Sequence, residues 1–152
     1  MRTFTLILGL ICFTLPLVNE VRAHCEIPCG IYGDDTRFQL LEEHLTTIEK
    51  SMKKIIELEK TGGNTNQLVR WIHNKEAHAE EFGHIVTQYF LSQRIKTSKT
   101  PGKPDLTNKK YLKQLILLHE LYVFSMKAKQ STNIRHIATM RSILRRFKLL
   151  YH

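Results

Sequence analysis

Residues 38–55 of this chain read FQLLEEHLTTIEKSMKKI, and they decide the fold. Polar and charged residues separate apolar residues that recur at spacings of four, three, four and three, namely Leu41, Leu45, Ile48, Met52 and Ile55. This period places the apolar side chains on one face of an α-helix. The pattern ends near residues 61–64, Thr-Gly-Gly-Asn, where a helix stop is expected. The stretch therefore predicts a long helix that buries one stripe of side chains.

Three more apolar stripes with helical spacing follow along the chain. They are Leu68, Ile72, Ala79, Phe82, Val86 and Tyr89; Leu112, Leu115, His119, Tyr122 and Met126; and Ile137, Met140, Leu144, Phe147 and Tyr151. Residues 101–104 separate the second stripe from the third, and residues 130–133, Gln-Ser-Thr-Asn, mark the turn into the fourth, with Ser or Thr as candidate N-caps. The sequence predicts an all-α protein, an antiparallel up-down four-helix bundle over residues 36–151.

Residues 1–23 have the pattern of a secretory signal peptide. A positive charge at Arg2 precedes an almost uninterrupted apolar run over residues 4–18, and a polar run ends at Ala23. The apolar run of 15 residues is shorter than the ~20 that span a bilayer, so a cleaved signal is favoured over an uncleaved anchor. The signal would direct export to the periplasm or out of the cell, and cleavage after Ala23 would leave one domain, residues 24–152.

The exported chain would be strongly basic. Removal of the signal lowers the formal net charge from +9 to +8, because it takes away Arg2, Arg22 and Glu20. A surface of this charge attracts anions. The Lys and Arg residues are scattered along the amphipathic stretches rather than grouped with aromatic residues, so nucleic acid is not an expected partner. No stable membrane association is expected after signal cleavage.

A cluster of metal-ligating groups lies directly behind the cleavage point. Residues 24–32 read His-Cys-Glu-Ile-Pro-Cys-Gly-Ile-Tyr. Cleavage would give His24 a free α-amine beside its imidazole, a backbone amide and two thiols, which together are a metal-ligand set. Pro28 disfavours helix in the residue before it and Gly30 permits positive φ, so a compact non-helical loop is expected. The alternative is a small disulfide between Cys25 and Cys29, as is common in exported proteins.

The motif His-Cys-x-x-Pro-Cys-Gly-x-Tyr at a processed N-terminus resembles the nickel hook of nickel-containing superoxide dismutases, a family of four-helix bundles. The resemblance implies one nickel ion per subunit, which cycles between Ni(II) and Ni(III) as superoxide is converted to dioxygen and hydrogen peroxide. It implies planar ligation by the His24 α-amine, the Cys25 backbone nitrogen and the thiolates of Cys25 and Cys29. The His24 imidazole would be the axial ligand. A homo-oligomer, a hexamer, is implied as well.

Other residues of the hook receive supporting roles from the resemblance. Tyr32 would order solvent or a small anion beside the open axial face and restrict access, or pack the loop onto the bundle. Pro28 and Gly30 would shape the loop. Family members orient the axial imidazole with a glutamate and an arginine, and an approximate alignment places Gln39 and His78 at those positions as a possible second shell. Solvent-exposed positions without a role are the alternative for both residues.

The remaining histidines offer weaker signals. Glu81 and His84 have the spacing of a di-iron ligand pair, but that site needs a second such pair, which the chain lacks. No ligand-like partner at helical spacing accompanies His44, His73, His119, His136 or His152, so these are expected to be surface or core residues.

Two hypotheses follow from these patterns. The first is an exported nickel superoxide dismutase. The alternative is a secreted basic helical-bundle binding protein, closed by a Cys25–Cys29 disulfide and without catalysis. The thiol state distinguishes them, because the enzyme needs two free thiols and stoichiometric metal.

Overall fold

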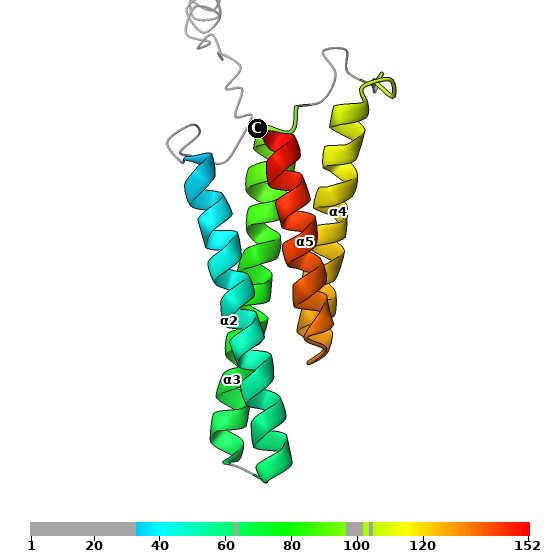
Figure 1. Cartoon of the computed structure of the whole chain (residues 1–152). Helices are drawn as coiled ribbons and strands as arrows, with labels where there is room; N and C mark the ends of the chain where they lie inside the picture. Colours follow the sequence, from blue (N-terminus) through cyan, green and yellow to red (C-terminus); the bar gives the residue numbers. More distant parts are fainter. Residues whose placement is uncertain (1–32, 63, 97–101, 104) are drawn as a thin grey trace, which may run out of the picture.

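The computed structural model describes residues 33–62, 64–96, 102–103 and 105–152. Four antiparallel helical rods stand side by side (Figure 1). They are α2 (Asp34–Thr61), α3 (Thr65–His84) continued by the π-helical segment η1 (Ile85–Arg94), α4 (Lys109–Gln130) and α5 (Arg135–Tyr151). The described residues contain no strand. The predicted all-α antiparallel four-helix bundle is confirmed.

Local signals set the helix boundaries. The first helix, α2, ends at Gly62, whose φ of 62° is left-handed and whose N–H bonds back to Leu58. An asparagine side chain caps the N-terminus of both α3 and α4, through Asn64 and Asn108. The expectation of a Ser or Thr cap for the last helix is wrong, because the N-cap position of α5 is Ile134, whose side chain forms no capping hydrogen bond. The preceding residue, Asn133, accepts the N–H of Arg135 at 3.2 Å through its Oδ1.

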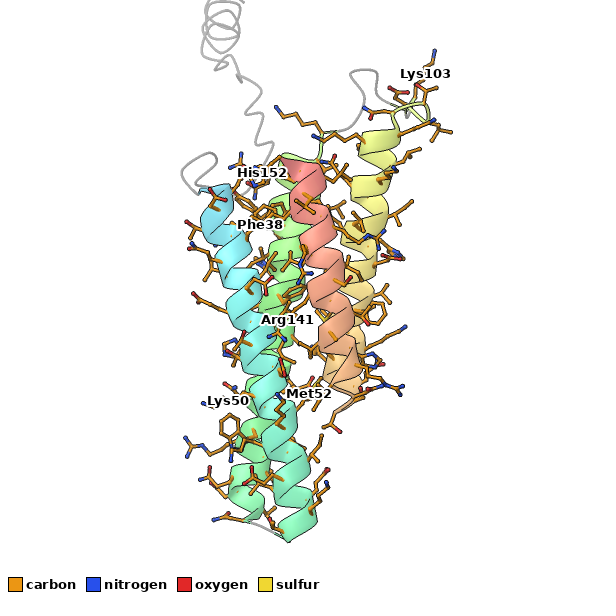
Figure 2. The ribbon with its side chains drawn as sticks, in the orientation of Figure 1. Phe38, Lys50, Met52, Lys103, Arg141 and His152 are labelled. Atoms are coloured by element: carbon orange, nitrogen blue, oxygen red, sulfur yellow. The ribbon has the colours of Figure 1, made fainter. Side chains whose placement is uncertain are left out.

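The core follows two of the predicted stripes closely. The α2 stripe is fully buried, and so is the α5 stripe except for its last member, Tyr151. Figure 2 shows Phe38 and His152 at the same end of the bundle and Arg141 between α5 and α2. The Arg141 guanidinium pairs with Glu49 on α2. Packing of α5 on α2 therefore combines a buried apolar seam with an ion pair at its edge.

The predicted stripe of α4 is wrong in register. His119, Tyr122 and Met126 are exposed, and the buried positions of α4 are Gln114, Leu117, Leu118, Leu121, Ser125 and Ala128. Apolar residues lie on most sides of this helix, so periodicity alone did not single out the buried face. Ile72 of the second stripe is also exposed, because the α2–α3 hairpin extends beyond the turn between α4 and α5 (Figure 1).

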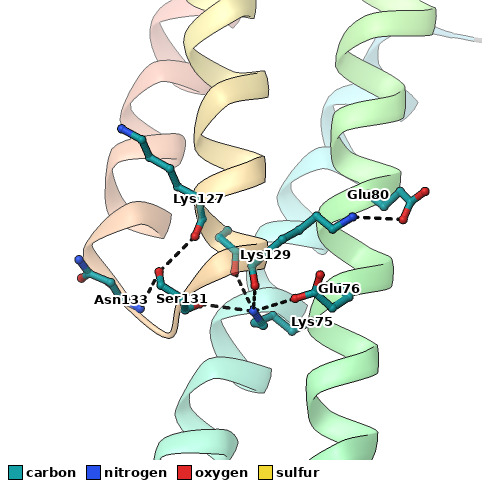
Figure 3. A network of polar contacts seen from close by, with 8 residues as sticks. Lys75, Glu76, Glu80, Lys127, Lys129, Ser131 and Asn133 are labelled. Atoms are coloured by element: carbon teal, nitrogen blue, oxygen red, sulfur yellow. Dashed lines mark hydrogen bonds and ion pairs between the residues drawn. The ribbon is translucent and has the colours of Figure 1, made fainter.

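A buried lysine joins α3 to the turn between α4 and α5 (Figure 3). Only 4% of the Lys75 surface is exposed. Its Nζ donates to the carbonyl oxygens of Ala128 at 3.0 Å and of Lys129, and it pairs with Glu76 at 2.9 Å. The last carbonyls of a helix lack partners within the helix, and its C-terminus favours a positive charge. Lys75 therefore caps α4 from a neighbouring helix.

None of the described helices combines the length and apolar character that crossing a bilayer would require.

Candidate metal centre

The predicted ligands and loop residues lie outside the described residues. These are His24, Cys25, Pro28, Cys29, Gly30 and Tyr32, together with the predicted signal peptide, residues 1–23. The described chain begins at Gly33, the residue that follows Tyr32. The structure therefore describes the bundle residues that directly follow the predicted hook in the sequence.

Asp34, at the start of α2, is held by side chains from two other helical segments. Asp34 is the first residue of α2, and its carboxylate accepts hydrogen bonds from the hydroxyls of Tyr89 in η1, at 2.5 Å, and of Tyr151 in α5, at 2.8 Å. Arg94 Nε lies 2.9 Å from the same carboxylate, and the Arg94 guanidinium also donates to the Tyr89 hydroxyl at 2.8 Å. We call these four residues the Asp34 cluster. It ties the start of α2 to the ends of η1 and α5.

The π-helical segment contributes two members of the cluster. In η1 the backbone bonds run from residue i+5 to residue i, as from the Ile95 N–H to the Phe90 oxygen at 2.9 Å. The wider turn lets the side chains of Tyr89 and Arg94, five residues apart, reach the same carboxylate. Short π-helical stretches are rare and often accompany functional sites.

The Asp34 cluster contains an ionised carboxylate and a guanidinium at neutral pH. Burial opposes ionisation of Asp34, but the hydrogen bonds from the two tyrosines and the charge of Arg94 outweigh it and lower the pKa of Asp34 below its usual 3.8. Burial, together with the Asp34 carboxylate, raises the pKa of Tyr89 and of Tyr151. The carboxylate is therefore ionised while both phenols keep their protons. Its place in the first turn of α2 also suits the helix dipole.

A layer of aromatic rings supports the Asp34 cluster from inside the bundle. The rings of Phe38 and Phe90 have centroids 4.8 Å apart, and the rings of Phe90 and Phe147 are 5.2 Å apart and perpendicular. Tyr151 joins this layer at 5.6 Å from Phe90. Such contacts add to the stability gained from apolar burial. Asp34, two positions after Tyr32 in the sequence, is therefore anchored on a packed part of the core.

We expect Asp34→Asn to lower the free energy of unfolding by about 1–2 kcal/mol at pH 7, because two hydroxyl donors lose a charged acceptor and Arg94 loses its ion-pair partner. Because the lost interaction needs an ionised carboxylate, the difference in the free energy of unfolding should depend on pH. A lowered folded pKa contributes stability above pH 3.8 that disappears as pH falls through the folded value, so the difference should shrink below pH 3.8. Urea unfolding at several pH values measures it. The control is Asp35→Asn, whose carboxylate side chain is 79% exposed, with an expected change within about 0.5 kcal/mol. Equal losses for the two variants would contradict the assignment.

The two candidate second-shell residues lie in different surroundings. Gln39 is exposed and lines a shallow groove between α2 and α5 with Glu42 and Lys148. His78 is half-buried on α3, with its Nδ1 at 2.9 Å from Nδ1 of His44 on α2. Among the described side chains, no hydrogen bond joins Gln39 to His78. Their role toward His24 stays a prediction.

Sequence reasoning missed several of these residues. His44 was predicted to have no ligand-like partner at helical spacing, and the partner that it has, His78, lies on the facing helix 34 residues away, where helical spacing gives no signal. Tyr151 was assigned to the apolar stripe, but its hydroxyl also donates a hydrogen bond to the Asp34 carboxylate. An acidic residue in the first turn of a helix is a weak signal for Asp34, and no sequence signal joins it to residues 55 and 117 positions away. In the part of the chain that the structure describes, no group of three or more His, Cys, Asp or Glu side chains could hold a metal ion.

The described residues form a four-helix bundle, and in the sequence a histidine and two cysteines within six residues precede it as candidate metal ligands. The family model for nickel-containing superoxide dismutases matches residues 19–152, which include the whole motif, and the chain belongs to this family. It is an oxidoreductase that acts on superoxide with a nickel cofactor. A comparison with curated proteins finds no significant match, and neither does a comparison with solved structures.

Proposed function

We propose that this chain converts superoxide to dioxygen and hydrogen peroxide by Ni(II)/Ni(III) cycling at residues 24–32, with one nickel ion per subunit. Two superoxide ions and two protons give one dioxygen and one hydrogen peroxide. The observation that carries the proposal is the family match over residues 19–152, which spans the complete His-Cys-x-x-Pro-Cys-Gly-x-Tyr motif.

The donor set fits nickel. The α-amine and imidazole of His24, the backbone nitrogen of Cys25 and the thiolates of Cys25 and Cys29 would hold the ion. Nitrogen and sulfur donors in one plane suit Ni(II). When bound, nickel supplies one-electron redox chemistry, provided that strong donors bring its potential within reach of superoxide. Two thiolates and a deprotonated amide are such donors, and the metal keeps both thiols deprotonated.

The rest of the chain would position this loop and attract the substrate. Pro28 and Gly30 shape the loop, and Tyr32 orders solvent or a small anion at the open face. The Asp34 cluster fixes the backbone two residues after Tyr32, so it limits the positions that the hook can adopt. The formal charge of +8 on residues 24–152 favours the approach of an anionic substrate.

The proposal includes maturation and assembly. The signal peptide, residues 1–23, would direct export to the periplasm or out of the cell, and its removal after Ala23 creates the amine ligand. A homohexamer would let neighbouring subunits cover the hooks. The enzyme domain would comprise residues 24–152.

Intact mass and metal analysis of protein purified from its native host test the proposal together. We expect a chain that begins at His24, carries two free thiols and holds about one nickel ion. An N-terminus even one residue upstream would remove the amine ligand and contradict the ligand set. A mass two units below the reduced chain, with no metal, would instead show a Cys25–Cys29 disulfide and a protein without this chemistry.

A further inference from the structure

Two histidines on facing helices form a close pair, and one of them, His78, is also a candidate for orienting the His24 imidazole. Nδ1 of His44 on α2 lies 2.9 Å from Nδ1 of His78 on α3, and the ring centroids are 5.1 Å apart. Both residues are half-buried. His44 lies ten residues after Asp34, which is about 15 Å along the helix axis from the end that carries the predicted hook.

The surroundings of the pair favour a neutral His44 ring and a bound cation. Burial, and next the neighbouring His78 ring, lower the pKa of His44 below its usual 6.5, while the carboxylates of Glu43 and Glu81 act in the opposite direction. Two adjacent imidazolium ions would repel each other, so the metal-free pair is held by one N–H···N hydrogen bond. Neutral imidazole is the form that binds metal ions. The two acidic neighbours add negative potential beside it.

The spacing of the nitrogens matches adjacent positions around a metal ion. With metal–nitrogen bonds of about 2.0–2.1 Å, two ligands at right angles have nitrogens about 2.9 Å apart, whereas tetrahedral ligands are about 3.4 Å apart. The observed 2.9 Å is the distance of an N–H···N hydrogen bond, and it shows that the two Nδ1 atoms can approach as closely as ligands at right angles around one ion. Square-planar or tetragonal sites with nitrogen and oxygen donors are typical of Cu(II) and Ni(II).

We propose that His44 and His78 form a second metal site, a two-imidazole chelate for Cu²⁺ or Ni²⁺ that bridges α2 and α3. The ring that donates in the metal-free pair moves its proton, through solvent, from Nδ1 to its own Nε2. Both rings stay neutral, both Nδ1 lone pairs point at the metal after a tilt of the half-buried rings, and no net proton is released. Water fills the remaining positions, so the ion is exchangeable.

The test uses the full mature chain loaded with nickel and titrated with further Ni²⁺ by calorimetry. We expect a second, weaker site in the wild type. Loss of an outer partner of a metal ligand already costs about 10–100-fold in affinity, so His44→Gln or His78→Gln, which removes one of two protein ligands, should weaken this site at least about a hundredfold. His73→Gln, an exposed histidine on α3, is the matched control and should keep it. Circular dichroism checks that each variant is folded.

Ring resonances of the two histidines provide a second readout. Paramagnetic Ni²⁺ should broaden the His44 and His78 signals together, before those of the other histidines outside the hook. A second site of unchanged affinity in both glutamine variants, or equal weakening in His73→Gln, would overturn the proposal. Failure of the nickel hook is distinguishable, because a chain without hook nickel should still bind one Ni²⁺ at this pair, with no sulfur-to-nickel absorption.

Discussion

Replacing Cys25 or Cys29 by serine should abolish nickel retention and superoxide dismutation while leaving the helical content nearly intact. A serine hydroxyl stays protonated at neutral pH, so the nickel would lose one of its two thiolates and the low potential that they provide. In the described part of the chain the core runs from Phe38 to Phe147, and we expect the bundle to fold on these residues without either cysteine. Metal analysis, a dismutation assay and circular dichroism on the same preparations measure the three quantities.

A matched control comes from the same loop. Glu26→Gln changes a side chain that is not a proposed ligand and leaves the backbone in place, so nickel should be retained. Under the disulfide hypothesis, either cysteine substitution would lower thermal stability and there would be no activity to lose. Retained dismutation in Cys29→Ser would refute the hook mechanism.

The second large effect separates the proposed axial ligand, His24, from the proposed planar ligands. His24→Gln keeps the α-amine, the Cys25 amide and both thiolates, so nickel should remain bound. Without the imidazole, Ni(III) loses its fifth donor, and the redox potential should rise beyond the range in which superoxide can both reduce and oxidise the metal. We expect activity to fall by at least about a hundredfold, a loss of roughly 2.7 kcal/mol in transition-state stabilisation.

Electron paramagnetic resonance gives a readout that does not depend on turnover. The resting wild-type enzyme should show a Ni(III) signal split by one axial nitrogen, and His24→Gln should lose it while metal analysis still finds nickel. A variant that kept both the split signal and wild-type activity would show that His24 is not the axial ligand.

Features that depend on neighbouring residues could be predicted from the sequence. The period of apolar residues in α2 and α5 reports which side of a helix avoids water, because residues three and four apart lie on the same face. The stops at Gly62 and between α4 and α5 are equally local. The hook motif is a run of nine residues, and for that reason the sequence was enough to suggest the family that the match over residues 19–152 confirms; its ligands stay a prediction.

Periodicity failed where a helix offers more than one apolar side or lacks a partner. Much of α4 is apolar, and its buried face was decided by where α3 and α5 pack against it. Ile72 belongs to a regular stripe but lies where the α2–α3 hairpin has no facing pair of helices, so it stays exposed.

The sequence by itself determined the helices, most of the buried stripes and the candidate ligand set of this protein, because the pattern for each lies within one short, continuous stretch of residues. Only the tertiary structure brought Asp34 to Tyr89 and Tyr151, and His44 to His78, across separations of 55, 117 and 34 residues. No local pattern specifies such pairs. Their distances follow from how the four helices align along their length, and that alignment comes from the packing of the whole core.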